Sequence, residues 1–361
     1  MSDSDSPGRR AVVWSRLFVE ILLVVGVALV VYFGYVRERG PKHLKLALVT
    51  WTQDPFWQPL LRGAQDYADK SNVDLTIVQS TPEVDVQTQH IKDLLNSGID
   101  GIAVSPNDAN AQHDILLQAA NKVPLVTFDT DAPDSNRKRF VGIDNYAAGR
   151  ICAGELTEVM PDGGPVLISV GSVTMQHGRQ RRQGVIDELL GRGFDRDRDM
   201  DPVDGILKGP KFTVVATATD GGVPSKAVDS IAAALRAHPE TKGIVGLFSY
   251  SASAALEAIK QVGLSPDQFK IVSFDASDET QAALEAGAIH ASIVQDSYRC
   301  GYETMEVLAN EARGVARGPA ELSPMLYVGI DVLTTKNLAL LRSSGAVAMP
   351  SGESTTQPSS Q

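Results

Sequence analysis

Short apolar runs alternate with longer amphipathic stretches from residue 44 to about residue 313. The run 44–50 (LKLALVT) predicts a buried strand, and the apolar positions in 59–71 recur with helical spacing. Continuous apolar strands separated by helices are typical of parallel sheets covered on both faces, so we predict a doubly wound α/β fold. The predicted strand–helix units are too many for one ordinary open sheet, so they could form either a single closed barrel or two separate sheets. The further predicted strands are 73–79, 101–105, 124–129, 140–143, 166–170, 212–218, 243–248, 270–274 and 290–294, and the further predicted helices include 86–98, 109–122, 145–160, 175–193, 225–239 and 297–313.

Residues 17–36 form an apolar segment of another kind, interrupted only by Glu20. Twenty helical residues cover ~30 Å, the hydrocarbon thickness of a bilayer, and Tyr32 and Tyr35 lie where interfacial aromatic residues are expected. We therefore predict a transmembrane helix at 17–36, between a cytoplasmic N-terminus at 1–16 and a linker at 37–44. A cleaved signal peptide is the alternative, although no A-x-A cleavage pattern follows the segment.

Charge is unevenly distributed along the chain. The whole sequence has 33 basic and 44 acidic residues, a net charge of -11. Removing the 7 basic and 4 acidic residues of 1–45 leaves 26 and 40, so the remaining body carries -14. This balance argues against a nucleic-acid-binding protein, whose affinity comes mainly from Lys and Arg. The two cysteines do not indicate a compartment by themselves.

Polar and aromatic side chains gather directly after the predicted strands. Ligands of α/β proteins bind beyond the carboxyl ends of the strands, so these residues are candidates for a binding site. Carboxylates and amides accept pairs of hydroxyl hydrogens, and an aromatic face covers the apolar face of a sugar ring. The combination predicts a sugar site. The residues are 52–57 (TQDPFW) after the first strand, 129–131 (DTD), 249–251 (SYS), Asp275, and Gln295 with Asp296.

Motifs of catalysis and cofactor binding are missing from the sequence. It has no H-E-x-x-H, G-x-S-x-G, P-loop or G-x-G-x-x-G pattern, and the segment 221–226 (GGVPSK) has the wrong spacing for phosphate binding. We therefore predict no enzymatic activity, no cofactor and no metal site, although a barrel enzyme stays open as an alternative. A sugar-responsive repressor would carry a helix-turn-helix where this chain has its apolar segment.

The chain resembles the periplasmic sugar-binding proteins of the ribose-binding type, which serve ABC importers. The resemblance runs from Lys45 to about Asn337 and rests on the order and spacing of several motifs. These are ALVTWTQDPFWQPLLRGAQDYAD, KDLLNSGIDGIAVSPND, KVPLVTFDTDAP, VGIDNYAAGR, GRQRRQGV, IVSFDAS and ASIVQDSYRCGYE. It implies a type I periplasmic-binding-protein fold, with two parallel-sheet lobes joined by three crossover strands. The implied ranges are 45–142 plus 296–328 for lobe 1 and 143–295 plus 329–342 for lobe 2. The polar, low-complexity composition of 343–361 predicts a disordered tail.

The resemblance also implies a set of ligand-binding residues. Asp54, Phe56 and Trp57 match the loop that holds and stacks on the sugar. Thr130 departs from the arginine of ribose binders, which puts ribose itself in doubt. Tyr250, with Ser249, lies where an asparagine is usual, and Cys152 and Cys300 fall in different lobes, so we expect free thiols. The full predicted set is Asp54, Phe56, Trp57, Asp129, Asp131, Arg181, Tyr250, Asp275 and Gln295.

Each of these residues also has a structural interpretation. Asp129 or Asp275 could be the N-cap of the next helix, one of Phe56 and Trp57 could belong to the core, and Arg181 could lie on a solvated basic helix face.

The function implied is that of the substrate-binding component of an ABC sugar importer. It would bind a pentose or hexose between closing lobes and deliver it to a permease with its ATPase. We expect a periplasmic monomer tethered to the inner membrane, or a soluble periplasmic protein if the segment is cleaved. A sugar sensor that signals to a membrane partner is the alternative function.

Overall fold

The computed structural model describes residues 23–28, 42–315, 318 and 323–343. The chain divides into two units, residues 1–43 and 44–361. In the first unit residues 23–28 are helical, and the rest of the predicted span at 17–36 lies outside the described residues. Within the described ranges, no helix combines the length and the apolar character needed to cross a bilayer. Residues 344–361 of the predicted tail also fall outside the described part.

The second unit contains two separate open sheets and no closed barrel among its described residues. In the first sheet every strand pair is parallel, as the apolar pattern predicted. The strand order is β12-β5-β4-β3-β1-β2. The strands are β1 (Leu44–Thr50), β2 (Val73–Gln79), β3 (Gly101–Val104), β4 (Leu125–Phe128), β5 (Arg139–Gly142) and β12 (Met325–Tyr327).

The second sheet is parallel at its centre and antiparallel at both edges. Its order is β13-β11-β10-β9-β6-β8-β7, with β13 antiparallel to β11 and β7 antiparallel to β8. The prediction of parallel sheets is confirmed for the centre of this sheet, and the two antiparallel edge strands were not foreseen. Only residues 209–211 join β7 to β8, and such a short turn reverses the chain into an antiparallel pair, because a parallel pair needs a long crossover connection. The strands are β6 (Gly164–Val170), β7 (Leu207–Lys208), β8 (Phe212–Thr219), β9 (Gly243–Gly246), β10 (Lys270–Phe274), β11 (Ala291–Gln295) and β13 (Ile330–Thr334).

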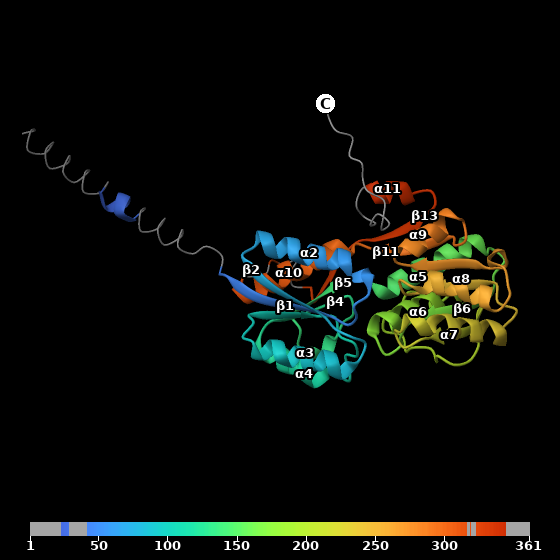
Figure 1. Cartoon of the computed structure of the whole chain (residues 1–361), viewed down its shortest axis with the longest axis horizontal. Coiled ribbons are helices and arrows are strands. Elements are labelled where there is room, and N and C mark those ends of the chain that lie inside the picture. The colour runs from blue at the N-terminus through green and yellow to red at the C-terminus, as the bar shows by residue number, and fades with distance from the viewer. Residues whose placement is uncertain (1–22, 29–41, 316–317, 319–322, 344–361) are drawn as a thin grey trace, which may run out of the picture. The chain divides into compact units, whose positions relative to one another are not determined.

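Helices cover both faces of each sheet (Figure 1). On the first sheet, α2 (Gln58–Lys70) and α10 (Ser297–Arg313) lie on one face and α3 (Val84–Asn96) and α4 (His113–Lys122) on the other. On the second sheet the two faces are covered by α5 with α6 and by α7 with α8. These and the remaining helices are α5 (Asn145–Val159), α6 (Gln176–Leu189), α7 (Pro224–Ala237), α8 (Ser251–Gln261), α9 (Asp278–Glu285), α11 (Leu338–Ser343) and the 3₁₀ turns η1 (Pro55–Trp57), η2 (Pro133–Ser135) and η3 (Pro266–Gln268).

The alternation of side chains along β1 divides the core of the first sheet. Leu46 and Leu48 pack toward α2 and α10, whereas Ala47 and Val49 pack toward α3 and α4. Successive strand residues point to opposite faces, so a strand covered on both sides must be apolar throughout. This is why 44–50 carries no polar alternation.

The chain passes between the two sheets at three places. It leaves β5 for α5 through residues 143–144, returns from β11 to α10 through Asp296, and crosses again from β12 to β13 through residues 328–329. Each passage is one or two residues long. They bring the carboxyl ends of strands from both sheets into one region.

Glycines allow the helices next to this region to approach closely. A Cβ on Gly149 of α5 would lie 2.0 Å from the backbone oxygen of Arg181 on α6, and one on Gly301 of α10 would lie 1.9 Å from that of Leu60 on α2. No side chain fits at such distances. The backbone of α6, which carries Arg181, is therefore set directly against α5.

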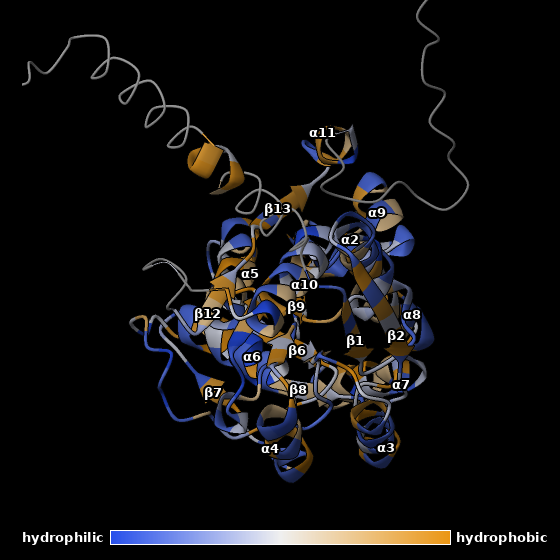
Figure 2. Cartoon of the chain, turned by 90° about the vertical axis from the view of Figure 1, so that its left-hand side faces the viewer, coloured by the Kyte–Doolittle hydropathy of each residue, from blue (hydrophilic) through white to orange (hydrophobic). Residues whose placement is uncertain are grey.

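The helix α6 is polar in sequence, and Figure 2 shows it mostly in hydrophilic colours, yet most of its residues are buried. Its buried charges have partners. Asp187 accepts a hydrogen bond from Tyr146 at 2.8 Å and forms ion pairs with Arg192 at 3.1 Å and Arg198 at 3.0 Å. Burial of paired polar groups is tolerated because each keeps its hydrogen bonds. A solvated basic face, the structural interpretation of Arg181, is therefore not what the helix presents.

Candidate functional site

A cavity lies where loops of both sheets meet. About 350 Å³ lies between its lining atoms, including space open to solvent, and the centre of a water molecule can reach about 30 Å³ of it. The accessible volume is far below that of small-molecule sites, roughly 300 to 1,000 Å³. The residues lining it are Trp51, Thr52, Asp54, Phe56, Trp57, Asp129, His177, Arg181, Phe248, Ser249, Tyr250, Asp275 and Gln295.

Strand order explains why these residues converge. Around β1 the first sheet has the sequence β2-β1-β3-β4-β5, and around β6 the second sheet has β8-β6-β9-β10-β11. In both sheets the second strand lies on one side of the first strand, and the later strands lie on its other side. The connections to the two sides run over opposite faces of the sheet, which leaves a crevice at the carboxyl end of the first strand. The lining residues follow β1, β4, β9 and β10, end β11, or lie on α6, which follows β6.

The loop after β1 is held by its own side chains. Asp54 accepts a hydrogen bond from the backbone N–H of Phe56 at 2.7 Å and so caps η1. Trp57 is completely buried, and its indole N–H donates to Thr52 Oγ1 at 2.9 Å. Trp57 is therefore the core member of the aromatic pair, while Phe56 is half-buried. Burial raises the pKa of Asp54, against the opposing effect of the Phe56 N–H.

Asp129 and Asp275 are buried carboxylates, each directly after a strand. Neither caps a helix, because the N-cap of α9 is Ser277 and that of η2 is Ala132. Asp275 accepts a hydrogen bond from Gln295 Nε2 at 3.0 Å. Burial raises the pKa of Asp275 to about 6, although the Arg181 charge opposes the shift.

The same two causes act on Asp129. Burial raises its pKa and Arg181 lowers it. The Trp51 indole also favours the ionised carboxylate, although no hydrogen bond of normal geometry joins the two groups.

Arg181 is the cation of the cavity. Its Nε donates to Asn145 Oδ1 at 2.8 Å and its Nη1 to the Leu247 carbonyl at 3.0 Å, and the guanidinium lies 4.0 Å from the ring centre of Phe274. These contacts fix the plane of a buried guanidinium, which interacts electrostatically with Asp275 and Asp129. It can donate to ligand oxygens from one fixed position.

Aromatic rings connect the two sides of the cavity. The ring centres of Trp51 and His177 are 6.4 Å apart, those of His177 and Phe248 5.1 Å, and those of Phe248 and Tyr250 5.9 Å. Burial, followed by the Arg181 charge, lowers the pKa of His177 well below its usual value, so the imidazole is neutral at pH 7. Its Nδ1 has no hydrogen-bond partner in the described structure.

Tyr250 is oriented by a carboxylate behind it. Its hydroxyl donates to Asp220 Oδ1 at 2.9 Å, and burial raises the pKa of Asp220 to about 6. Gly171 leaves room for this arrangement, since a Cβ there would lie 2.6 Å from the Tyr250 hydroxyl.

The structure places all the predicted ligand-binding residues in this lining except Asp131. The Asp131 carboxylate instead accepts hydrogen bonds from Arg137 Nε and Nη2 at 2.5 Å each, and from Thr127 Oγ1 and the Ala132 N–H. Because Arg137 also donates to the Pro324 carbonyl at 3.0 Å, this pair joins the loop after β4 to the segment before β12. We therefore assign Asp131 a structural role in place of ligand contact.

Some lining residues were missed from the sequence. Trp51 directly follows β1, so the rule that selects strand ends could have found it. Phe248 was assigned to a strand at 243–248, but β9 ends at Gly246. His177 had no signal beyond its place in the segment MQHGRQRRQG.

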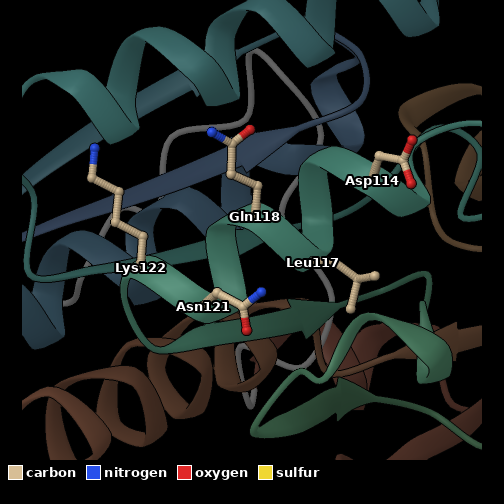
Figure 3. Close-up of a pocket in the computed structure, with 5 residues that line it drawn as sticks. All are labelled: Asp114, Leu117, Gln118, Asn121 and Lys122. Carbon is tan, nitrogen blue, oxygen red and sulfur yellow. The ribbon is translucent and has the colours of Figure 1, made fainter.

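Two other features lack the converging side chains of this cavity. A larger depression of about 780 Å³ is lined by five residues of α4, whose side chains are drawn in Figure 3: Asp114, Leu117, Gln118, Asn121 and Lys122. Four of their side chains are exposed, and no second element supplies a converging group. Glu155, Glu158 and His290 have ligand atoms within 4.8 Å of one another, but none of them lines the cavity.

The comparison with protein families concerns most of the chain. Residues 47–316 match the model of the periplasmic binding protein domain. The chain belongs to this family. Its two sheets, its three passages between them and the cavity at the strand ends agree with that membership, and the resemblance seen in the sequence is confirmed at this level.

The individual relatives that match this chain differ from it at most positions of the sequence. A putative rhizopine-binding protein of Rhizobium meliloti is 25% identical over 79% of this chain and 88% of its own length. The ribose import binding protein of Salmonella typhimurium is 24% identical over 74% of this chain and 85% of its own. Among solved structures, an ABC transporter solute-binding protein of Burkholderia graminis in complex with D-arabinose has a TM-score of 0.73 and 24% identity, covering 83% of this chain and 98% of that one. This last similarity concerns the fold.

Proposed function

We propose that this protein is the substrate-binding component of an ABC sugar importer. It binds a monosaccharide, a pentose or a hexose, between two closing lobes and delivers it to a membrane permease with its ATPase. The lobes are the predicted ones, 45–142 plus 296–328 and 143–295 plus 329–342, and the protein acts as a periplasmic monomer without catalytic function.

The observation that carries this proposal is the lining of the cavity. Three carboxylates, one fixed guanidinium and the Gln295 amide surround a space walled by Trp51, Phe56, Trp57 and Phe248. Carboxylates and guanidinium groups match the hydroxyls of a sugar, and aromatic rings match its C–H faces. The import and sugar-binding names of the relatives favour transport over the sensor alternative.

The small accessible volume of the cavity indicates how a ligand enters it. Water centres reach only about 30 Å³, so a sugar enters only if the lining residues from the two sheets separate. Closure over the ligand then removes it from water. Two or three charge-assisted hydrogen bonds at ~1.5 to 3 kcal/mol each, with ring stacking at ~1 kcal/mol, give roughly 4 to 10 kcal/mol, a range that reaches the about 8 kcal/mol of micromolar binding. Binding and closure are thus one event, and the closed form is what a permease would recognise.

Titration calorimetry of the full chain in detergent tests the sugar assignment. The panel is D-ribose, L-arabinose, D-xylose, D-glucose and D-galactose together with their amino derivatives. We expect a dissociation constant at or below the micromolar range for at least one sugar-type ligand. The absence of heat with every member of the panel would refute the proposal.

The apolar segment 17–36 supports a membrane tether as part of this proposal. Its length matches a bilayer, and its cationic flanks suit the two surfaces. We expect the full chain to sediment with membranes and to resist carbonate extraction, and its mature N-terminus to include residue 1. Release into the soluble periplasmic fraction with a shortened N-terminus would show a cleaved signal peptide.

A further inference from the structure

We propose that the ligand carries a positively charged nitrogen, as in an amino sugar or an amino-substituted polyol, and that Asp54 receives this group. The inference rests on the proposed function, since it names the chemical class of the ligand for the same cavity. It starts from the charges that line the cavity.

The lining contains more negative than positive charge. Asp54, Asp129 and Asp275 are carboxylates, and Arg181 is the cation among the lining residues. His177 is neutral. If all three carboxylates ionise, the cavity carries a net charge of -2 before a ligand enters.

Nearby cations do not correct this excess. None of the ion pairs between described residues includes any of the three lining carboxylates. Arg137, eight positions after Asp129, forms its ion pair with Asp131, which does not line the cavity. Thr130, beside Asp129, is uncharged and buried.

Among the three carboxylates, Asp54 lacks a compensating cation. Arg181 interacts electrostatically with Asp129 and Asp275, but Asp54 is influenced instead by the negative charge of Glu279. Its Oδ1 accepts the N–H of Phe56, and no hydrogen bond is formed by Oδ2 within the described structure. A ligand ammonium placed at Asp54 would thus meet an open acceptor in a negative field.

The hydrogen-bonding groups of the lining point to the same ligand. His177 Nδ1 is buried and unpartnered, and a neutral imidazole can accept a hydrogen bond at one of its nitrogens. Together with the carboxylates this makes a lining rich in acceptors. An ammonium group offers three donors and no acceptor, so it matches such a site better than a hydroxyl does. Burial is the main cause that raises the pKa of Asp54, Asp129 and Asp275, and the negative charge of Glu279 adds to it at Asp54.

The test is a calorimetric comparison of matched ligand pairs with the full chain in detergent. The pairs are D-glucose with D-glucosamine, D-galactose with D-galactosamine, and myo-inositol with a monoamino-inositol, at pH 7. N-acetyl-D-glucosamine serves as an uncharged nitrogen control. We expect at least one amine to bind tenfold or more tightly than its hydroxyl partner.

Two variants connect the preference to Asp54. Asp54→Asn removes the charge but keeps a side chain that caps η1 equally well, so the fold is retained. We expect it to abolish the preference for the amine. Asp69→Asn, an exposed position on α2, is the matched control and should leave both affinities unchanged.

The outcomes separate this inference from the proposed function. If the neutral sugars bind and every amine binds equally or more weakly, the inference fails and the proposed function stands. The inference also fails if Asp54→Asn keeps the preference. If no member of any pair binds, the inference fails, and the wider sugar panel, which contains ribose, arabinose and xylose, decides whether the proposed function stands.

Discussion

Asp129 and Asp275 occupy equivalent positions in the two sheets, the first after β4 and the second after β10. Their φ angles are +60° and +59°, and each backbone N–H donates to the neighbouring strand, to Val141 at 3.0 Å and to Ile293 at 2.7 Å. The left-handed region costs most residues roughly 1 to 2 kcal/mol, and Asp and Asn tolerate it best. Two strand ends of the same geometry thus aim one carboxylate from each sheet into the cavity.

Replacement of Asp275 by Gly and by Ala should test this geometry. Both variants lose the carboxylate, but only Gly adopts φ near +59° without strain. We expect Asp275→Gly to be about 1 kcal/mol more stable than Asp275→Ala in denaturant titrations. At Asp229, an exposed position inside α7, the order should reverse because Gly weakens a helix. The same order at both positions would contradict the assignment.

The stability of the protein should also depend on the ionisation of Asp275. Its pKa is about 6 in the folded state, above its ordinary value of 3.8, so the folded chain binds more protons between these pH values and loses stability as pH rises through that window. Asp275→Asn does not titrate. We expect its free energy of unfolding to gain on the order of 2 kcal/mol relative to the wild type between pH 4 and pH 7. Parallel pH profiles for the two proteins would exclude this effect.

The apolar pattern predicted the parts of the fold that depend on local order. Strands such as 44–50 and 270–274 agree with β1 and β10, because a strand covered on both faces must be apolar along its whole length. Among the strands at the sheet edges, β2 was predicted, but β7, β12 and β13 were not. The two residues of β7 and the three of β12 are too short to show a period, and their pairing depends on distant partners.

For the candidate site, the sequence indicated which residues lie at strand ends but not which contacts they form. Asp275 and Asp129 follow strands, so a rule about strand ends selects them. Asp131 satisfies the same rule, but its partner Arg137 lies six positions later, and only the folded loop brings the two together. The Tyr250 contact with Asp220 likewise joins residues that follow different strands, which no local pattern reports.

Arg181 should be required for both binding and stability. Arg181→Ala would leave the buried Asp129 and Asp275 without the positive charge that favours their ionised forms, so we expect the variant to be less stable than the wild type. We expect at least a tenfold loss of ligand affinity by calorimetry. Arg181→Lys keeps the charge but not the paired donors to Asn145 and Leu247, so it should retain more stability and still bind weakly. Arg179→Ala, half-buried and outside the lining, is the control, and an equal effect of Arg179→Ala would refute the role of Arg181.

The contact between α5 and α6 should set the position of Arg181. A Cβ on Gly149 would lie 2.0 Å from the Arg181 backbone oxygen, so Gly149→Ala must push α6 away, at a cost of about 1 to 3 kcal/mol. Gly154 lies on the same helix, where an added methyl group would have nothing within 4 Å, and Gly154→Ala should be neutral or up to about 1 kcal/mol stabilising. Thermal unfolding and ligand titration of both variants check this. Because the displaced α6 carries Arg181, Gly149→Ala should also weaken binding, whereas a Gly149→Ala variant that unfolds and binds like Gly154→Ala would show that the helix spacing does not position the guanidinium.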